Sequence, residues 1–280
     1  MSESGIDPQA FNAFEAAGWQ QKAPAYDAFF ASVTGRAVDP LLDAIGAGPG
    51  VRLLDVASGP GYVAAAAARR GAQVTGVDIA ESMIKLARGA HPEIDFRQGD
   101  AEALPFPDAS FDAVVSNFGV LHFGRPEQAA AEFARVVAAG GAVALTVWDV
   151  PAQSRLIGVF VDAMAEAGAV PPSDLPTGPA FFQFSDDKAF IELLAGAGLV
   201  DVAVTTVTFQ KQVPSADLLW DGLLAGTVRT ASVILGQPPQ VQARIRAAFD
   251  RLVSGYPSGD GGIDLPVSVK LASGRRPVAD

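Results

Sequence analysis

The stretch Val51-Arg52-Leu53-Leu54-Asp55-Val56-Ala57-Ser58-Gly59-Pro60-Gly61 decides how the chain folds. It begins as an apolar run with β-branched residues, which is typical of a buried strand. It then becomes a turn of small residues, and the alanine-rich segment 64–70 beyond it consists of strong helix formers. Strand, tight glycine turn and helix form the first half of a βαβ unit, and parallel sheets bind ligands at such a turn.

The spacing of the small residues bears on which ligand the turn binds. Ala57, Gly59 and Gly61 are spaced two apart, whereas a dinucleotide fingerprint has the pattern G-x-G-x-x-G. Asp55, directly before the turn, would be a poor neighbour for a pyrophosphate but a good one for a cationic ligand. The first N–H groups of the following helix are unpaired and can face a ligand carboxylate or phosphate.

Asp55-x-Ala57-x-Gly59-x-Gly61 resembles the first motif of class I S-adenosylmethionine-dependent methyltransferases, D-x-G-x-G-x-G, with Ala57 in place of the first glycine. The resemblance covers residues 50–150 by motif and extends by fold pattern to residue 210 and the last strand. It implies an α/β fold with a doubly wound, Rossmann-like sheet of seven mostly parallel strands. It also implies S-adenosyl-L-methionine as cofactor, with contacts from Asp55, Ala57, Ser58, Gly59 and Gly61.

The segment 73–78 predicts a second strand that ends in an acid, Asp78. An acid about 20 residues beyond a glycine turn can accept hydrogen bonds from both ribose hydroxyls of an adenosine group. Capping of the next helix, which is expected over 81–88, is the alternative. The family pattern puts Ile79 and Met83 beside the ribose and the adenine, although Met83 could equally belong to the core.

A third strand, expected over 94–98, leads into Gly99-Asp100-Ala101-Glu102, which resembles the third methyltransferase motif. In that family the Asp carboxylate, here Asp100, meets the adenine amino group, and the next backbone N–H meets a ring nitrogen. A carboxylate can accept from an exocyclic amino group but not from a ring acceptor, so the residue type fits the contact. A solvated loop acid is the alternative, and it suits Glu102 better than Asp100.

Residues 110–117 predict a fourth, central strand, because the apolar run is short and continuous. The family pattern puts Asn117, Phe118 and Gly119 at the floor of the cofactor site, near the transferable methyl group. His122 follows just past the strand tip, where an imidazole can take a proton from a substrate near pH 7. A packing or helix-capping role for His122 stays open.

The N-terminal segment 8–46 predicts two or three helices, with an interruption at Pro24. Residues 19–27 resemble the lid that often precedes the core in this family and covers the cofactor. We expect simple packing for Trp19, whereas for Tyr26 both packing and a contact with cofactor or substrate are open.

The rest of the chain predicts a helix over 126–139, a fifth strand over 142–149 and two insertions in the core. We hypothesise that the insertions form a cap over an apolar substrate chamber, with a dimer contact as the alternative role of one insertion. The expected organisation is N-terminal helices and lid (1–50), cofactor-binding core (51–150), first cap insertion (151–185), core continuation (186–213), second cap insertion (214–260), and last strand with tail (261–280).

Composition narrows the function further. Hydrophobic residues make up 49% of the chain and charged residues 18%, which is typical of a globular protein with a sizeable core. A net charge of −11 argues against nucleic-acid binding, because phosphate contacts require clustered Lys and Arg. The chain has no cysteine, no signal peptide is read and no apolar run is long enough to cross a bilayer, so we expect a cytoplasmic protein.

The sequence therefore predicts an S-adenosylmethionine-dependent methyltransferase acting on a small, apolar or aromatic molecule, without a metal. The cofactor carries the electrophilic methyl group, so the protein supplies mainly orientation and removal of water. Two alternatives are an NAD-type oxidoreductase on the same fold, against which the glycine spacing speaks, and a catalytically silent cofactor-binding protein.

Overall fold

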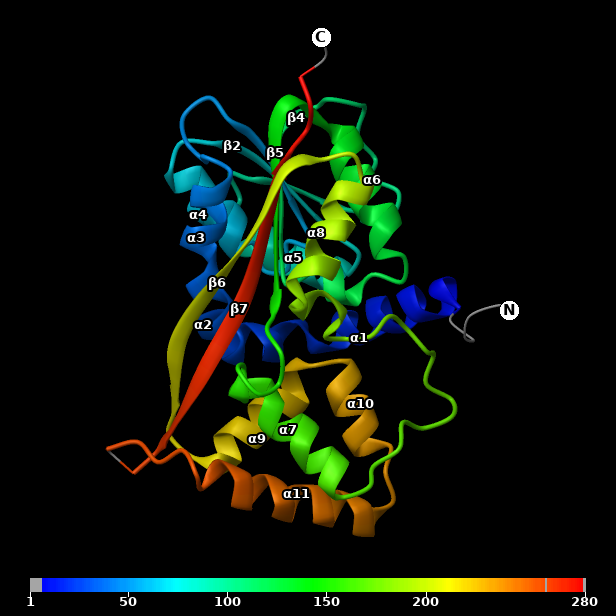
Figure 1. Cartoon of the computed structure of the whole chain (residues 1–280), viewed down its shortest axis with the longest axis vertical. Helices are drawn as coiled ribbons and strands as arrows, with labels where there is room; N and C mark the ends of the chain where they lie inside the picture. Colours follow the sequence, from blue (N-terminus) through cyan, green and yellow to red (C-terminus); the bar gives the residue numbers. More distant parts are fainter. Residues whose placement is uncertain (1–6, 260, 279–280) are drawn as a thin grey trace.

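The computed structural model describes residues 7–259 and 261–278. Seven strands form one sheet in the order β3-β2-β1-β4-β5-β7-β6, and β7 runs antiparallel to both of its neighbours (Figure 1). The strands are β1 (Arg52–Val56), β2 (Gln73–Asp78), β3 (Asp95–Gln98), β4 (Phe111–Asn117), β5 (Val137–Trp148), β6 (Val200–Val213) and β7 (Ile263–Arg275). The predicted doubly wound, mostly parallel sheet of seven strands is confirmed.

Helices cover both faces of the sheet, α3 to α5 on one face and α6 and α8 on the other (Figure 1). The helices up to β4 are α1 (Pro8–Phe29), α2 (Ala31–Thr34), η1 (Gly35–Ala37), α3 (Val38–Ala44), α4 (Tyr62–Arg69) and α5 (Glu81–Ala90). Those after it are η2 (Val120–His122), α6 (Pro126–Val136), α7 (Arg155–Glu166), η3 (Gln183–Ser185), α8 (Asp187–Gly196), α9 (Ala216–Gly226), α10 (Arg229–Leu235) and α11 (Pro239–Val253).

Two hydrophobic cores lie on opposite faces of the sheet because successive side chains of a strand point to opposite sides. In β1, Leu53 packs with Leu41 and Ala67 on the side of α3 and α4. Its neighbour Leu54 packs with Phe133 and Phe190 on the side of α6 and α8. A strand that is buried on both faces reads as a continuous apolar run, which is why β1 and β4 were recognisable in the sequence.

The N-terminal segment differs from the prediction. One helix, α1, runs over 22 residues and continues through Pro24 instead of stopping there. Proline in a helix interior removes one backbone hydrogen bond and crowds the preceding turn. Helix α1 is held in place by packing against both α5 and α9, and this packing outweighs the local preference.

The approach to β5 also differs from the prediction. Helix α6 ends at Val136, three residues before the expected end at Ala139. Val137 already pairs with Phe111, and the next paired residue is Ala142, so residues 138–141 form an irregularity in the strand. The β-branched pair at 136 and 137 favours the extended conformation over the helix that the flanking alanines suggested.

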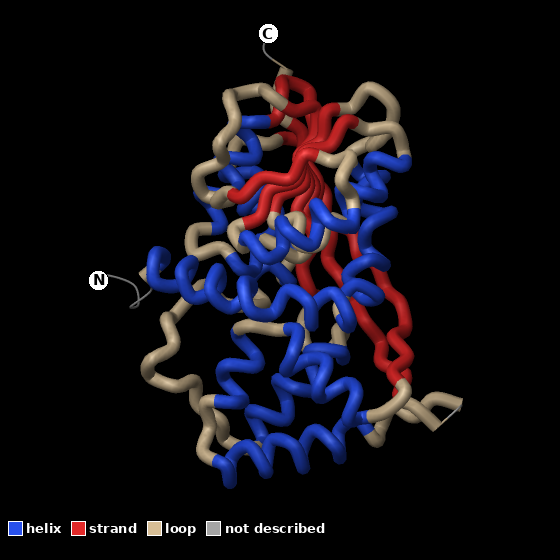
Figure 2. Tube along the Cα trace, turned by 180° about the vertical axis from the view of Figure 1, so that it is seen from behind, coloured by secondary structure: helices blue, strands red, loops and turns tan. Residues whose placement is uncertain are grey.

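Four helices, α7 and α9 to α11, form a group beyond the carboxyl edge of the sheet, and α1 lies between this group and the sheet (Figures 1 and 2). Within the group α7 packs on α11 and α10 on α9, and α9 packs on α1. The long strands β6 and β7 reach down to it as a two-stranded ribbon.

The helical stretch expected over 215–235 is broken into α9 and α10, which are bent by 108° relative to each other. Within the described residues no single helix is long and apolar enough to cross a membrane, although this bent pair together meets the criteria of length and composition.

Candidate active site

A pocket lies at the carboxyl ends of β1, β2 and β4, between the sheet, α1 and the start of α10. Loops at this edge of a parallel sheet face the crevice where α/β folds bind ligands. All predicted site residues except Gly61 line the pocket, namely Tyr26, Asp55, Ala57, Ser58, Gly59, Asp78, Ile79, Met83, Gly99, Asp100, Ala101, Glu102, Asn117, Phe118, Gly119 and His122.

The turn after β1 adopts the left-handed backbone conformation at alternate residues. Ala57, Gly59 and Gly61 have φ angles of 55°, 52° and 88°. A Cβ atom on Gly59 would meet nothing within 4 Å, whereas one on Gly61 would lie 2.7 Å from the Phe96 ring. Gly59 thus leaves space on the pocket side, while Gly61 permits close packing of the turn on β3. Ala57 holds its left-handed conformation at a cost of about 1 kcal/mol.

Asp78, at the tip of β2, is bound to the glycine turn. Its Oδ2 accepts a hydrogen bond from the Gly59 N–H and its Oδ1 one from the Ala80 N–H, both at 2.9 Å. Burial raises the pKa of Asp78, while the N–H donors and the nearby His122 oppose this shift. An ionised carboxylate has about four acceptor sites, so Asp78 also has capacity for a ligand. The bond to the N–H of Ala80, the residue before α5, ties Asp78 to the entrance of that helix.

Asp55, at the tip of β1, is 1% exposed. Its Oδ2 accepts a hydrogen bond from the Ala64 N–H at 3.1 Å, and its Oδ1 has no partner in the described part of the chain. Burial raises the pKa of Asp55 to about 8; the Ala64 N–H lowers it, and the charge of Asp78 raises it further. A cationic group placed beside Asp55 would favour the ionised carboxylate.

The two acids of the loop after β3 have different surroundings: Asp100 faces the pocket, and Glu102 binds another part of the chain. Asp100 accepts the Glu102 N–H at 2.8 Å and lines the pocket. Glu102 is 2% exposed, and its carboxylate binds both the backbone N–H and the Nε of Arg125, at 2.7 and 2.8 Å. Glu102 therefore ties this loop to the start of α6, and its polar atoms are already engaged.

The tip of β4 is held by a side chain of β5 and by a backbone carbonyl of the N-terminal segment. Asn117 donates to the Thr34 carbonyl at 3.1 Å and accepts from the Thr146 hydroxyl at 2.6 Å. Phe118 has a φ of 59°, and its ring lies 4.3 Å from that of Trp148. A Cβ atom on Gly119 would lie 2.3 Å from the Ser116 Oγ, so only glycine fits there.

Helix α1 forms one wall of the pocket. The Tyr26 hydroxyl donates to the Thr34 Oγ1 at 3.3 Å, and burial raises the pKa of Tyr26 to about 12. Trp19 packs against the cluster of Ala23 and Met83, as expected, but it also lines the pocket.

A polar group that the sequence analysis missed sits beside His122. Glu15 is 2% exposed, and its Oε2 lies 3.0 Å from the His122 Nδ1. The same oxygen accepts the Trp19 indole N–H at 3.0 Å. Since an ionised carboxylate only accepts, the His122 Nδ1 donates in this contact, and Nε2 is the ring nitrogen that Glu15 does not engage. Glu15 stands four residues from both Phe11 and Trp19, a spacing that puts the three on one helix face.

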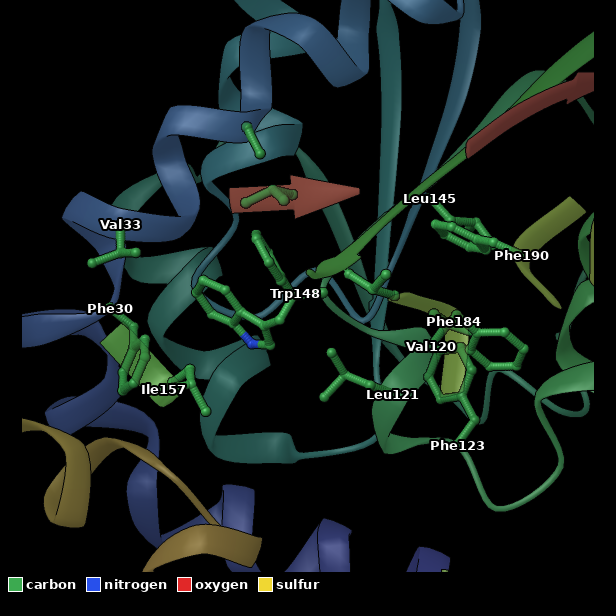
Figure 3. Packing of buried hydrophobic residues seen from close by; sticks show 14 of the residues in the cluster. Phe30, Val33, Val120, Leu121, Phe123, Leu145, Trp148, Ile157, Phe184 and Phe190 are labelled. Carbon is green, nitrogen blue, oxygen red and sulfur yellow. The ribbon is translucent and has the colours of Figure 1, made fainter. Parts of the chain in front are cut away.

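Aromatic and aliphatic side chains form an apolar part of the pocket wall. Trp148 of β5, Ile157 of α7 and Phe30 belong to one buried cluster and all line the pocket, and Figure 3 shows them gathered at the end of β5. Phe123 and Phe181 add two further rings. Phe181 lies in the Pro- and Gly-rich loop after α7. The aromatic residues of this loop are the feature of the sequence from which its contribution to the pocket could have been predicted.

The chain is similar to known methyltransferases. A family model described as a methyltransferase domain matches residues 54–145. Demethylmenaquinone methyltransferase of Renibacterium salmoninarum is 39% identical over 127 residues, which cover 45% of this chain and 54% of that protein. The chain thus spans about half the length of this relative. The protein of the same name from Chlorobaculum tepidum is 31% identical over 178 residues, 58% of this chain and 71% of the relative.

A solved structure with a similar fold is phosphoethanolamine N-methyltransferase 2 of Haemonchus contortus, determined with phosphomonomethylethanolamine and S-adenosylhomocysteine. It has a TM-score of 0.53 at 18% identity, over 86% of this chain and 52% of that one. At this level of identity, the likeness concerns the fold.

Proposed function

The chain belongs to the class I S-adenosylmethionine-dependent methyltransferases, and we propose that it transfers the methyl group of S-adenosylmethionine to a small apolar or aromatic acceptor. The observation that carries the proposal is the pair of buried acids at neighbouring strand tips, Asp55 and Asp78, around an open glycine turn. Family membership removes the NAD-type oxidoreductase from the alternatives.

The residues present suit the cofactor. Asp78 has acceptor capacity for ribose hydroxyls, and Gly59 leaves space where a side chain would otherwise stand. The unpartnered Oδ1 of Asp55 suits the ammonium group of the methionyl part. When bound, S-adenosylmethionine supplies a methyl group on a positively charged sulfur, which is the electrophile of the reaction.

The acceptor side of the pocket supports an apolar or aromatic substrate. The rings of Phe30, Trp148 and Phe181 stand on its walls, together with Ile157. Such walls hold an aromatic acceptor in one orientation and exclude water from the reacting atoms. Two relatives are named for demethylmenaquinone, and an acceptor of the quinone type would fit these walls.

We assign His122 the role of general base, with Glu15 as the residue that positions it. Glu15 holds the Nδ1 proton, so Nε2 is free to take a proton from the acceptor as its oxygen or carbon attacks the methyl group. The Glu15 carboxylate then stabilises the imidazolium that forms.

The proposal is tested first by calorimetry with S-adenosylhomocysteine. We expect Asp78→Ala to weaken binding by about 2–3 kcal/mol, because charge-assisted hydrogen bonds are lost. Glu93→Ala, which removes an acid from an exposed loop, is the matched control and should leave binding unchanged. Unchanged affinity of the Asp78 variant would remove this residue from the cofactor site.

The second test measures release of S-adenosylhomocysteine with phenolic and hydroquinone acceptors. We expect His122→Ala to slow turnover by roughly 10²-fold while cofactor affinity is retained. A near-normal rate would make His122 structural. Absence of release with every acceptor, despite tight cofactor binding, would favour the silent binding protein.

A further inference from the structure

Arg229 is the first residue of α10, in the helix group beyond the carboxyl edge of the sheet. It lines the pocket, and its guanidinium group is stacked between the rings of Phe11 and Phe181, 5.1 and 5.6 Å from their centroids. Its Nη2 donates to the Pro179 carbonyl at 3.0 Å, while its Nη1 is buried without a hydrogen-bond partner in the described part of the chain.

Arg155 is a buried arginine of the same helix group, and its hydrogen bonds can be compared with those of Arg229. Its guanidinium group donates to the Asp162 carboxylate, the Tyr256 hydroxyl and the Pro151 carbonyl, at 2.7, 2.8 and 2.9 Å. Every nitrogen of Arg155 thus has a partner. Arg229 has no carboxylate within ion-pair distance among the described residues.

The charge of Arg229 is uncompensated at close range. Burial lowers the pKa of its guanidinium group, and Glu15 opposes this shift through the electrostatic field alone. The Oε2 of Glu15 accepts from Trp19 and contacts His122, whereas its Oε1 has no hydrogen-bond partner within the described residues and forms no ion pair with Arg229 there. A partly buried charge without a hydrogen-bonded counter-ion is unfavourable, so the unpartnered Nη1 in a pocket wall points to a ligand that completes it.

We propose that Arg229 binds an anionic oxygen of the acceptor substrate, such as a phenolate, enolate or carboxylate. This proposal rests on the proposed function, because the proposed methyl transfer requires an acceptor, and we place that acceptor beside Arg229 and Phe181 in the pocket. The Phe181 ring contacts both Arg229 and His122, whose ring centroid lies 6.2 Å away, so the cation and the base stand around the same aromatic residue. The substrate class is therefore an aromatic molecule with an ionised or ionisable oxygen.

The test compares two probes of the same shape, 2-naphthoate and its neutral methyl ester, by calorimetry on protein saturated with S-adenosylhomocysteine. We expect wild type to bind the naphthoate at least tenfold more tightly than the ester. Arg229→Met should weaken naphthoate binding by roughly 10- to 100-fold and leave ester binding within about threefold, because a charge-assisted hydrogen bond is lost. Arg229→Lys should restore part of the preference.

Arg244→Met serves as the control, because Arg244 lies on α11 of the same helix group, is exposed and does not line the pocket. Equal affinity of wild type for the two probes would overturn the proposal, even if Arg229→Met failed to fold.

The methionyl carboxylate of the cofactor is the other source of an anionic oxygen. If it were the partner, Arg229→Met would weaken binding of S-adenosylhomocysteine but not of methylthioadenosine, and the substrate assignment would fall. The naphthoate comparison is repeated without S-adenosylhomocysteine. If the protein did not bind S-adenosylhomocysteine, the proposed function would be contradicted. The comparison of naphthoate with its ester would still show whether Arg229 binds an anionic oxygen, because it does not require the cofactor.

Discussion

At the scale of single residues, Asp55 is a buried acid whose ionised form is disfavoured in the ligand-free fold. Its carboxylate is buried at a strand tip beside Asp78, and the Ala64 N–H is its hydrogen-bond donor within the described chain. Desolvation favours the neutral acid and raises the pKa of Asp55 to about 8. A cofactor with an ammonium group would reverse this preference. The residue that we propose to bind the cofactor therefore destabilises the ligand-free fold when it is ionised.

The unfavourable ionisation of Asp55 predicts a pH dependence of stability. The pKa of Asp55 is higher in the folded state than its unfolded value of about 3.9, so the folded state binds the proton more tightly. Stability of the ligand-free protein should therefore fall as pH rises from about 4 to about 8. Urea titrations between pH 5 and 9 should show a steeper loss for wild type than for Asp55→Asn, which has no charge to bury. Parallel pH profiles would contradict the shift.

At the scale of elements, α1 determines the shape of the site. It supplies Glu15, Trp19 and Tyr26 to one wall, and it is held between α5 on the sheet and α9 on the other side. Its continuation through Pro24 gives up a backbone hydrogen bond, so packing sets the length of the helix.

Replacement of this proline tests that interpretation. We expect Pro24→Ala to raise the free energy of unfolding by about 1–3 kcal/mol, because the missing N–H returns to the middle of a helix and the side chain is exposed. The matched control is Pro40→Ala in the first turn of α3, where the N–H has no helical partner, and its effect should be smaller. A lower stability of Pro24→Ala, measured by urea denaturation, would show that the proline-induced geometry is required.

At the scale of the whole molecule, α1 packs against the helix group beside the part of the pocket where we propose that the acceptor binds. Gly18 of α1 faces Val228 at the bend between α9 and α10, and a Cβ atom there would lie 2.4 Å from the valine Cγ1. The neighbouring residue, Arg229, and Thr230 stand in the pocket wall. A small displacement at this contact would therefore move the proposed acceptor site relative to the cofactor site.

Gly18→Ala tests this coupling. Overpacking should make it less stable than Gly89→Ala by about 1–3 kcal/mol, and the KM for the acceptor should rise while affinity for S-adenosylhomocysteine is retained. Gly89→Ala is the control, because a Cβ atom there meets nothing within 4 Å and only helix propensity changes. Equal stabilities and equal KM values in the two variants would refute close coupling between α1 and the helix group.

The sequence by itself determined the sheet and most of the residues that line the pocket at its edge. Motifs such as the turn from Asp55 to Gly61 combine short-range backbone requirements with side chains at strand ends, so a local pattern suffices to predict them. The tertiary structure alone decided that Glu15 meets His122 across 107 residues, and that Arg229 faces the same pocket without an ion-pair partner in residues 7–259 and 261–278. These juxtapositions depend on how α1 and α10 pack, and packing is a property of the whole chain that no local pattern records.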